Sequence, residues 1–172
     1  ENINYPTEEE LAEFRRENAR ETAESLGLDA PAEVLDEALE RRLRFEPYPE
    51  SEEVMEELVE MGLPLYAVSN WDVALEGVLE DLGWSRYFSD IVASAKVGSE
   101  KPEGGIFEEA LRVAGVSLDR AVHVGNDPVS DVRGASSCGI DAVLIDREGD
   151  LEAPEAMVTL PDLRGLPALV RA

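Results

Sequence analysis

The chain has 172 residues, 44% of them hydrophobic and 31% charged, which is enough for one globular domain of ordinary size with a buried core. Its net charge of -24 makes nucleic acid and anionic membrane surfaces unfavourable partners, because binding to phosphate groups requires a basic face. No apolar run approaches the length of a membrane span. The single cysteine, Cys138, excludes an internal disulfide and a cysteine-cluster metal site, so we expect a reducing, cytoplasmic location.

The first 45 residues are predicted to form two acidic helices. Thr7 and Glu10 make a capping box for the first helix, and Gly27 is positioned to end it. Pro31 suits the first turn of a second helix, whose apolar stripe runs from Val34 to Leu39. We interpret the acidic side of both helices as a solvated face.

A connector and then a regular alternation of elements follow. The stretch "FEPYPES", residues 45–51, interrupts helical structure with two prolines and is typical of a link between two units. Helices are predicted at about 51–61, 72–82, 103–114 and 128–137, and short apolar strands at 64–68, 90–95, 121–125 and 141–146. This order predicts an α/β fold with right-handed crossovers and a Rossmann-like parallel sheet covered by helices on both faces.

Polar side chains follow three of the predicted strands where each strand ends. They comprise a hydroxyl, two amides, an ammonium and two carboxylates, namely Ser69, Asn70, Asn126, Lys101, Asp127 and Asp131. Ligands of open parallel sheets bind outside the carboxyl ends of the strands, so we expect these side chains to lie close together. An ammonium neutralises phosphate as a point charge, and carboxylates suit Mg²⁺. The pattern therefore favours a site for a phosphate and a divalent cation.

Each candidate also has a purely structural interpretation. Ser69 or Asn70 could cap the next helix, and Asp127 before Pro128 is typical of a helix N-cap followed by a proline at the first position. Asp131 would favour the dipole of that helix. A single lysine such as Lys101 is most often a surface residue. The order and spacing of the candidates, more than any one of them, favour the functional interpretation.

Two other reactive residue types are interpreted as packed side chains. His123 lies between Val122 and Val124 in a predicted strand, so we expect a core histidine. Cys138 precedes Gly139 and resembles a small buried residue, so we assign no reactivity to it.

Three segments resemble motifs of one enzyme superfamily, in the order in which that superfamily has them. "AVSNWD", "KVGSEKPEGGIFEEAL" and "HVGNDPVSDVRGA" are similar to motifs two, three and four of the haloacid dehalogenase superfamily of hydrolases. The resemblance covers roughly residues 45–146. It implies that residues 1–45 are the later part of a helical cap and that residues 46–172 are the α/β core.

The resemblance also implies roles for the polar residues. By position, Ser69 would hydrogen-bond the transferring phosphoryl group, together with Asn70 beside it. Lys101 would hold that group and orient the nucleophile. The cluster at 126–131 would hold Mg²⁺ through Asp127, Asn126 and Asp131. In the superfamily an Asp usually follows the Gly of motif four, whereas this chain has Asn126 there, so which of Asn126 and Asp127 faces the metal stays open.

The first motif of the superfamily, an Asp-x-Asp-like pair that ends an amino-terminal strand, has no counterpart here. Asp29 and Asp36 lie in polar, helical surroundings with no strand before them. The superfamily places that strand between the strand that ends at Ser69 and the strand that ends at Asn126. We therefore expect a gap one strand wide, or a strand supplied by a partner chain or by a segment that precedes Glu1.

Three functions are compatible with these residues. The first is a Mg²⁺-dependent phosphatase of a small phosphorylated metabolite, which uses an aspartyl-phosphate intermediate whose nucleophile lies outside the chain as given. The second is a 2-haloacid dehalogenase, which shares the fold but attacks carbon without a metal. The third is a non-catalytic or split module that binds a ligand or another chain.

Overall fold

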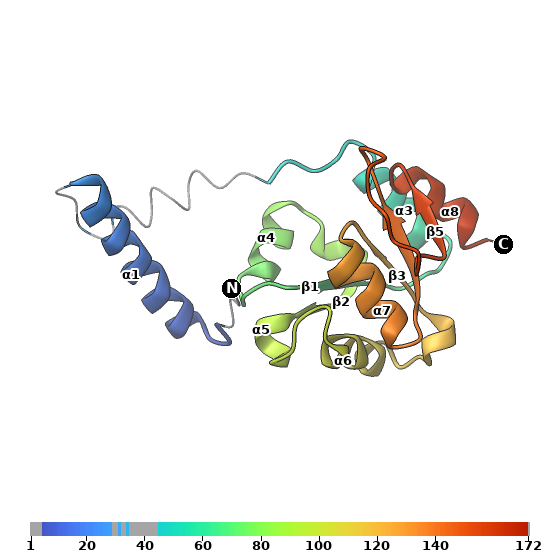
Figure 1. The fold of residues 1–172 in the computed structure, drawn as a ribbon, viewed down its shortest axis with the longest axis horizontal. Helices are drawn as coiled ribbons and strands as arrows, with labels where there is room; N and C mark the ends of the chain where they lie inside the picture. Colours follow the sequence, from blue (N-terminus) through green and yellow to red (C-terminus); the bar gives the residue numbers. More distant parts are fainter. Residues whose placement is uncertain (1–4, 29–30, 32–33, 35–44, 172) are drawn as a thin grey trace.

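The computed structural model describes residues 5–28, 31, 34 and 45–171, so most of the predicted second helix lies outside the described residues. Helix α1 (Glu8–Leu26) begins and ends as predicted. The Thr7 hydroxyl oxygen accepts the Glu10 N–H at 3.3 Å, and Gly27 adopts a left-handed φ of 63°. Figure 1 shows α1 lying apart from the rest of the described chain.

The remaining elements alternate along the chain as expected for an α/β unit. The helices are α3 (Ser51–Glu60), α4 (Leu75–Asp81), α5 (Ser94–Val97), α6 (Gly104–Ala114), α7 (Gly134–Ser137) and α8 (Leu166–Leu169). The strands are β1 (Leu65–Ser69), β2 (Phe88–Ala93), β3 (Val122–Gly125), β4 (Asp141–Ile145) and β5 (Val158–Leu160). Single helical turns lie at Ser85–Tyr87, Leu118–Arg120 and Leu163–Gly165, and a wider helical turn, η3, at Pro128–Arg133.

Two boundaries differ from the prediction, and side-chain hydrogen bonds explain one of them. Helix α4 starts at Leu75 rather than at residue 72, because the Asp72 carboxylate accepts the Ala74 N–H at 2.8 Å and holds a turn there. Strand β2 ends at Ala93, since Ser94 already opens the short helix α5.

All strand pairs are parallel, and they form two separate sheets. One sheet pairs β1 with β2, so that Ser69 lies beside Ala93. The other has the order β3-β4-β5, with Gly125 beside Leu144. The prediction of a parallel α/β fold is confirmed. Within the described ranges β1 and β3 do not pair with each other, as the expected gap requires; what fills the space between them stays a prediction.

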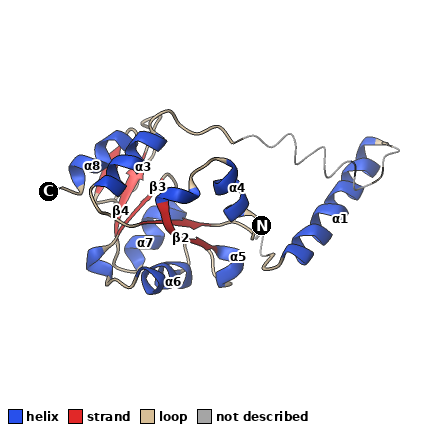
Figure 2. Cartoon of the chain, turned by 180° about the vertical axis from the view of Figure 1, so that it is seen from behind, coloured by secondary structure: helices blue, strands red, loops and turns tan. Residues whose placement is uncertain are grey.

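The same helices pack against both sheets. Ile106 and Phe107 of α6 are 0% and 1% exposed, in a core cluster that contains Val92 of β2 and Leu144 of β4. On the other face, α3 and α8 cover Val143 and Ile145 of β4, with Leu65 of β1 packed against that cluster. Figures 1 and 2 show α3 and α6 on opposite sides of the strands. Each large side chain buried in this way contributes roughly 1.5–3 kcal/mol, so the two sheets are held side by side without hydrogen bonds between β1 and β3.

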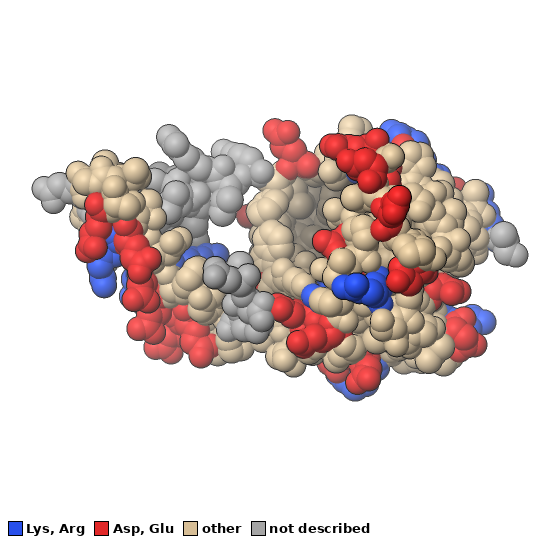
Figure 3. All heavy atoms as spheres, viewed as in Figure 1, with Lys and Arg blue, Asp and Glu red and all other residues tan. Residues whose placement is uncertain are grey.

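The surface of the molecule reflects its charge. Figure 3 shows acidic side chains along α1 and over the α/β unit, with fewer cationic ones on the same face. None of the helices that the structure describes combines the length and hydrophobicity needed to cross a membrane.

Candidate active site

Lys101 lies in the loop between α5 and α6 and points to the carboxyl end of β1. Its Nζ donates to the Val68 carbonyl oxygen at 3.0 Å and to Asp131 Oδ1 at 2.6 Å. The side chain is 13% exposed, so the interpretation as an ordinary surface lysine is wrong. An ammonium has three donors, and these two bonds leave one for a ligand.

Asn70 fixes the backbone of the lysine loop at the end of β1. Its Oδ1 accepts the Lys101 N–H at 2.7 Å, and its Nδ2 donates to the Lys101 carbonyl oxygen at 2.8 Å. Neither Asn70 nor Ser69 caps α4, whose N-cap is Ala74 without a side-chain hydrogen bond, so the capping interpretation of this pair is wrong. Ser69 is half-buried, and its hydroxyl forms no hydrogen bond with the residues that the structure describes. It is therefore available to a ligand.

Asp131 receives three donors and connects the two sheets. Its Oδ1 accepts from Lys101 and lies 3.1 Å from His123 Nε2, and its Oδ2 accepts the Asp127 N–H at 2.9 Å. The carboxylate is 7% exposed. Burial raises the pKa of Asp131, but the hydrogen bond with His123 and the Lys101 charge outweigh burial and hold the pKa well below its usual range. Asp131 therefore stays ionised and holds the Lys101 side chain in place.

Gly125, at the end of β3, allows this close approach. A Cβ atom at position 125 would lie 2.1 Å from Asp131 Cγ. Any larger residue would displace the carboxylate and, with it, the ammonium of Lys101. The glycine of the "HVGND" stretch is thus required by the packing of the site.

Asp127 and Asn126 offer exposed oxygens beside this network. Asp127 is the N-cap of η3, as its structural interpretation predicted: its Oδ1 accepts the N–H groups of Val129 and Ser130 at 2.8 and 2.7 Å. The Asp127 Oδ2 atom and the Asn126 side chain form no hydrogen bond with described residues. They are the oxygens of the predicted cluster that a cation could reach, whereas both Asp131 oxygens already face N–H donors.

Magnesium usually keeps several waters and takes one or two protein carboxylates together with substrate phosphate oxygens. No group of three or more His, Cys, Asp or Glu side chains with metal-binding geometry occurs in the described part of the chain. Among the described residues, Asn126 and Asp127 could contribute oxygens to such a ligand set, whose other members would come from elsewhere.

His123 is a member of the site that the sequence interpretation missed. Its ring packs edge-on against Phe107, with 5.2 Å between ring centroids, as expected for a core residue. Its Nε2 nevertheless reaches Asp131. The available signal was strand periodicity, because His123 and Gly125 share one face of β3.

Cys138 is half-buried, and burial raises the pKa of its thiol, in agreement with the absence of an assigned reactivity.

The face that carries these residues is hollowed. Figure 3 shows a depression between α4 and the orange segment that contains α7 in Figure 1, below the cyan segment that leads to α3. The carboxyl ends of β1 and β3 lead into α4 and η3 on its two sides. The hydroxyl, the ammonium and the oxygens described above thus gather at one edge of the two sheets.

A model of the haloacid dehalogenase-like hydrolase family matches residues 6–139 of the chain. The chain belongs to this family. The match includes the segments with Ser69, Lys101 and Asp131, in agreement with the resemblance seen in the sequence.

Curated relatives of this haloacid dehalogenase-like chain include two phosphatases. A phosphoserine phosphatase of Thermus thermophilus is 39% identical over 155 residues, which are 88% of this chain and 61% of the relative. A glyceraldehyde 3-phosphate phosphatase of Methanothermobacter thermautotrophicus is 35% identical over 108 residues, which are 59% of this chain and 46% of the relative. The chain thus spans about half to three fifths of the length of these relatives.

Solved structures of the family show the same fold. A phosphatase of Thermococcus onnurineus superposes with a TM-score of 0.72 at 30% identity, over 86% of this chain and 68% of the other. A 2-haloacid dehalogenase of Pseudomonas syringae superposes with a TM-score of 0.75 at 26% identity, over 94% and 71%. The solved structures with this fold therefore include both a phosphatase and a 2-haloacid dehalogenase.

Proposed function

We propose that the protein is a phosphatase that hydrolyses phosphate esters of small metabolites. The observation that carries the proposal is the position of Lys101 Nζ, held by Val68 at the end of β1 and by Asp131 beside β3. A fixed ammonium at this place stabilises the negative charge of a phosphoryl group without reorganisation. Relatives named as phosphatases support the same chemistry.

Some residues of this chain would contact the phosphoryl group, and others would hold those residues in position. The third N–H of Lys101 and the hydroxyl of Ser69 would donate to phosphoryl oxygens. Asn70 holds the backbone of Lys101, and Asp131 orients its ammonium. Because these groups are fixed before a ligand arrives, little entropy is lost when the phosphoryl group binds.

The nucleophile would come from a strand between β1 and β3. In the part of the chain that the structure describes, β1 and β3 each have one edge without a paired strand, and α3 and α6 cover the two faces beside them. Unpaired backbone groups at an enclosed strand edge are unfavourable, so a paired strand would remove this cost. A segment outside this sequence, or a partner chain, would supply the strand and its aspartate, and an aspartyl-phosphate would form on that residue.

Magnesium would be held by Asn126 and Asp127, with its remaining ligands from outside the described residues. Bound there, the ion would neutralise part of the phosphoryl charge. Asp131 would support Lys101 rather than the ion, since both of its oxygens face N–H donors.

The test is release of phosphate from a panel of small phosphate esters, by the protein with any preceding segment that its coding sequence specifies. We expect hydrolysis in the presence of Mg²⁺ and loss of hydrolysis in EDTA, restored by added Mg²⁺. Full turnover in EDTA would contradict the proposal.

A 2-haloacid dehalogenase is the second candidate. The superposition on the Pseudomonas syringae enzyme and the uncharged Asn126 favour it. Chloride release from a 2-chloro acid without added metal, and no phosphate release, would replace the phosphatase proposal by this one. Absence of both reactions in a folded protein that carries its natural amino-terminal sequence would favour a non-catalytic binding module.

A further inference from the structure

Residues 45–50, here called the connecting segment, contact both sheets of the molecule. At one end the Phe45 ring packs against Trp71, with 5.6 Å between centroids and an interplanar angle of 59°. Trp71 directly follows Ser69 and Asn70, the polar pair at the end of β1. The segment therefore begins beside the proposed phosphate site.

The other end of the connecting segment is fastened to the residue after β4. The Arg147 guanidinium lies 3.5 Å from the centroid of the Tyr48 ring, and its Nη1 lies 2.6 Å from Glu50 Oε1. Glu50 is 3% exposed, so this ion pair is enclosed at the edge of the second sheet. With contacts at both ends, the segment spans from the end of β1 to the end of β4, above the hollow in Figure 3.

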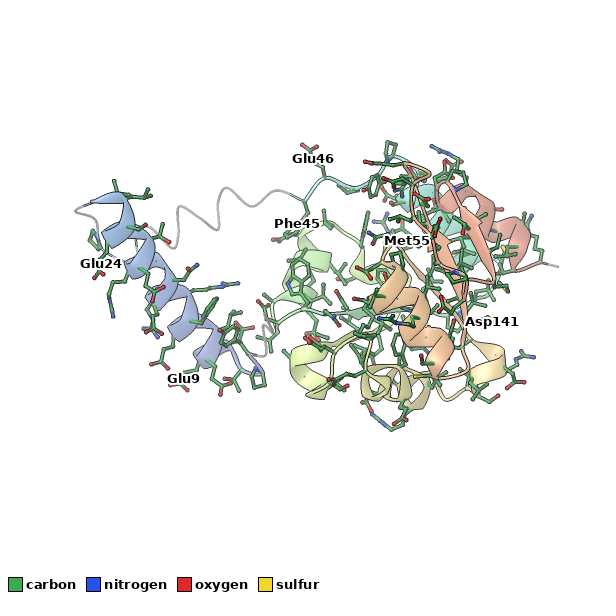
Figure 4. All side chains as sticks on the ribbon, viewed as in Figure 1. Glu9, Glu24, Phe45, Glu46, Met55 and Asp141 are labelled. Carbon is green, nitrogen blue, oxygen red and sulfur yellow. The ribbon has the colours of Figure 1, made fainter. Side chains whose placement is uncertain are left out.

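Trp71 is fixed independently of Phe45. Its backbone N–H donates to Ser94 Oγ at 3.1 Å, and the Ser94 hydroxyl donates back to the Trp71 carbonyl oxygen at 3.2 Å. Ser94 is 2% exposed, and the Trp71 ring packs against the cluster of Leu75, Leu79 and Ala93. The Trp71 backbone is therefore held by Ser94 and its ring by this cluster, and Phe45, which is 43% exposed, extends the same apolar surface. Figure 4 shows Phe45 leaving the connecting segment toward α4, at the rim of the hollow.

The charges around this pair disfavour a second anionic group on a bound molecule. The remaining donor of Lys101, which is paired with Asp131, is assigned to the phosphoryl group, and Arg147 is paired with Glu50, so neither of these cations is offered to a second anionic group. Glu46, labelled in Figure 4, follows Phe45 and is exposed, but its side chain points away from Phe45, so it adds only to the general negative charge of this surface. A neutral group that presents a flat apolar face would meet no such repulsion.

We propose that Phe45 and Trp71 form the contact surface for the organic part of the substrate, which selects phosphate esters of neutral, apolar or planar groups. This inference rests on the proposed function, because the phosphoryl group must bind at Lys101 for its ester group to reach the pair. The connecting segment holds Phe45 at the rim of the hollow.

The tryptophan content of the chain provides a direct readout that needs no turnover. The chain has two tryptophans, Trp71 and Trp84, so the Trp84→Phe variant leaves Trp71 as the single fluorophore. This variant, with its natural preceding segment, is titrated in Mg²⁺ with phenylphosphonate, methylphosphonate and phosphonoacetate. We expect phenylphosphonate to change Trp71 emission and to bind about tenfold more tightly than methylphosphonate. Phosphonoacetate, which carries a second anion, should bind most weakly.

Variants in the same background test the named residues. Phe45→Ala should reduce the preference for phenylphosphonate to less than about threefold and leave methylphosphonate affinity unchanged. Arg147→Met keeps Phe45 but releases Tyr48 and Glu50, so we expect part of the preference to be lost. Phe14→Ala is the matched control, because Phe14 is a similarly exposed aromatic residue (38%) on α1, and it should change nothing.

Three results would overturn the inference, and one of them would also overturn the proposed phosphate site. Equal affinity for phenylphosphonate and methylphosphonate in the Trp84→Phe protein would overturn it and leave the proposed phosphate site intact. If the folded protein binds none of the three phosphonates, both the proposed site and the inference fail. An unchanged preference in Phe45→Ala together with Arg147→Met would also overturn it, because the pair and its support would then be dispensable.

Discussion

Asp131 and Glu50 are two carboxylates enclosed in the same unit, yet they serve different parts of it. Their side chains are 7% and 3% exposed, and each lies 2.6 Å from a cationic nitrogen, of Lys101 and Arg147 respectively. The Lys101 ammonium retains a donor that can face the hollow, whereas the face of the Arg147 guanidinium is covered by Tyr48. One ion pair thus presents a charge to a ligand, and the other fastens a segment of chain.

The environments of these carboxylates explain how both stay ionised. Burial raises the pKa of each, but hydrogen bonds and cations outweigh it, so both pKa values lie below the ordinary range. For Asp131 the main opposing contacts are His123 and Lys101; for Glu50 they are its own backbone N–H and Arg147. A buried ion pair adds little net stability, but loss of one partner leaves the other charge uncompensated.

The largest effect on folding is expected for the pair in the hollow. Asp131→Asn leaves the Lys101 ammonium with a neutral partner in an enclosed place, so we expect the free energy of unfolding to fall by about 3 kcal/mol. Urea denaturation measures this difference. Asp141→Asn is the control, because Asp141 is exposed at the other end of β4, and it should change little. Equal stability of the Asp131 variant and the natural protein would show that the pair is not enclosed in solution.

The same variant gives a pH dependence with a defined sign. The pKa of Asp131 is lower in the folded state than in the unfolded state, so its stabilisation is fully present above the unfolded value of about 3.9. That contribution is lost as the pH falls toward the folded value. We therefore expect the stability difference between the natural protein and Asp131→Asn to shrink between about pH 5 and pH 2. A difference that stays constant over this range would contradict the assignment of the low pKa to Asp131.

A smaller loss of stability is expected for the pair at the edge. Arg147 is 25% exposed, compared with 13% for Lys101, so water can partly compensate its charge in Glu50→Gln. We expect this variant to melt at a lower temperature than the natural protein but above Asp131→Asn. Hydrolysis of a small ester without an apolar group should change less than about threefold. If Glu50→Gln and Asp131→Asn lost phosphatase activity to the same extent, the Glu50–Arg147 pair would also have to act on the phosphoryl group.

The smallest effect concerns the aromatic cover of Arg147. Tyr48 is 57% exposed, and a cation–π contact at such a site contributes about 0.5–1 kcal/mol. Tyr48→Leu should therefore destabilise the protein by about that amount in a urea titration. Tyr5→Leu is the control, because Tyr5 stacks on Phe14 in the amino-terminal region, away from Arg147. A stability loss larger than that of Glu50→Gln would reverse the order of the two contacts.

Local signals in the sequence predicted much of the fold. The apolar runs of β1 and β4 and the capping residues Thr7 and Asp127 act through neighbours a few positions away, and the structure contains each of them. The convergence of Lys101 with the end of β1 also followed from topology, since parallel strands end at one edge.

Contacts between distant residues could not be predicted in this way. Asn70 binds the backbone of Lys101 across 31 positions, although its type and place suggested a phosphate contact or a helix cap. His123 sits in an apolar strand, where only the position of Asp131 in space reveals its hydrogen bond. Glu50 and Arg147 lie in a connector and in a loop, and no local pattern links the two. Such pairs depend on how helices and sheets pack, which single residues do not encode.

The most direct test of the proposed function compares the two lysines of the chain. Lys101 is enclosed beside Asp131, whereas Lys96 is an exposed residue paired with Glu76, so Lys96→Ala is a matched control for Lys101→Ala. Both variants are made in the protein with its natural preceding segment, and phosphate release is measured at saturating Mg²⁺. We expect kcat to fall by about 100- to 1,000-fold in Lys101→Ala and to stay within about twofold in Lys96→Ala. Equal activity of the two variants would contradict the assignment of Lys101 to the phosphoryl group.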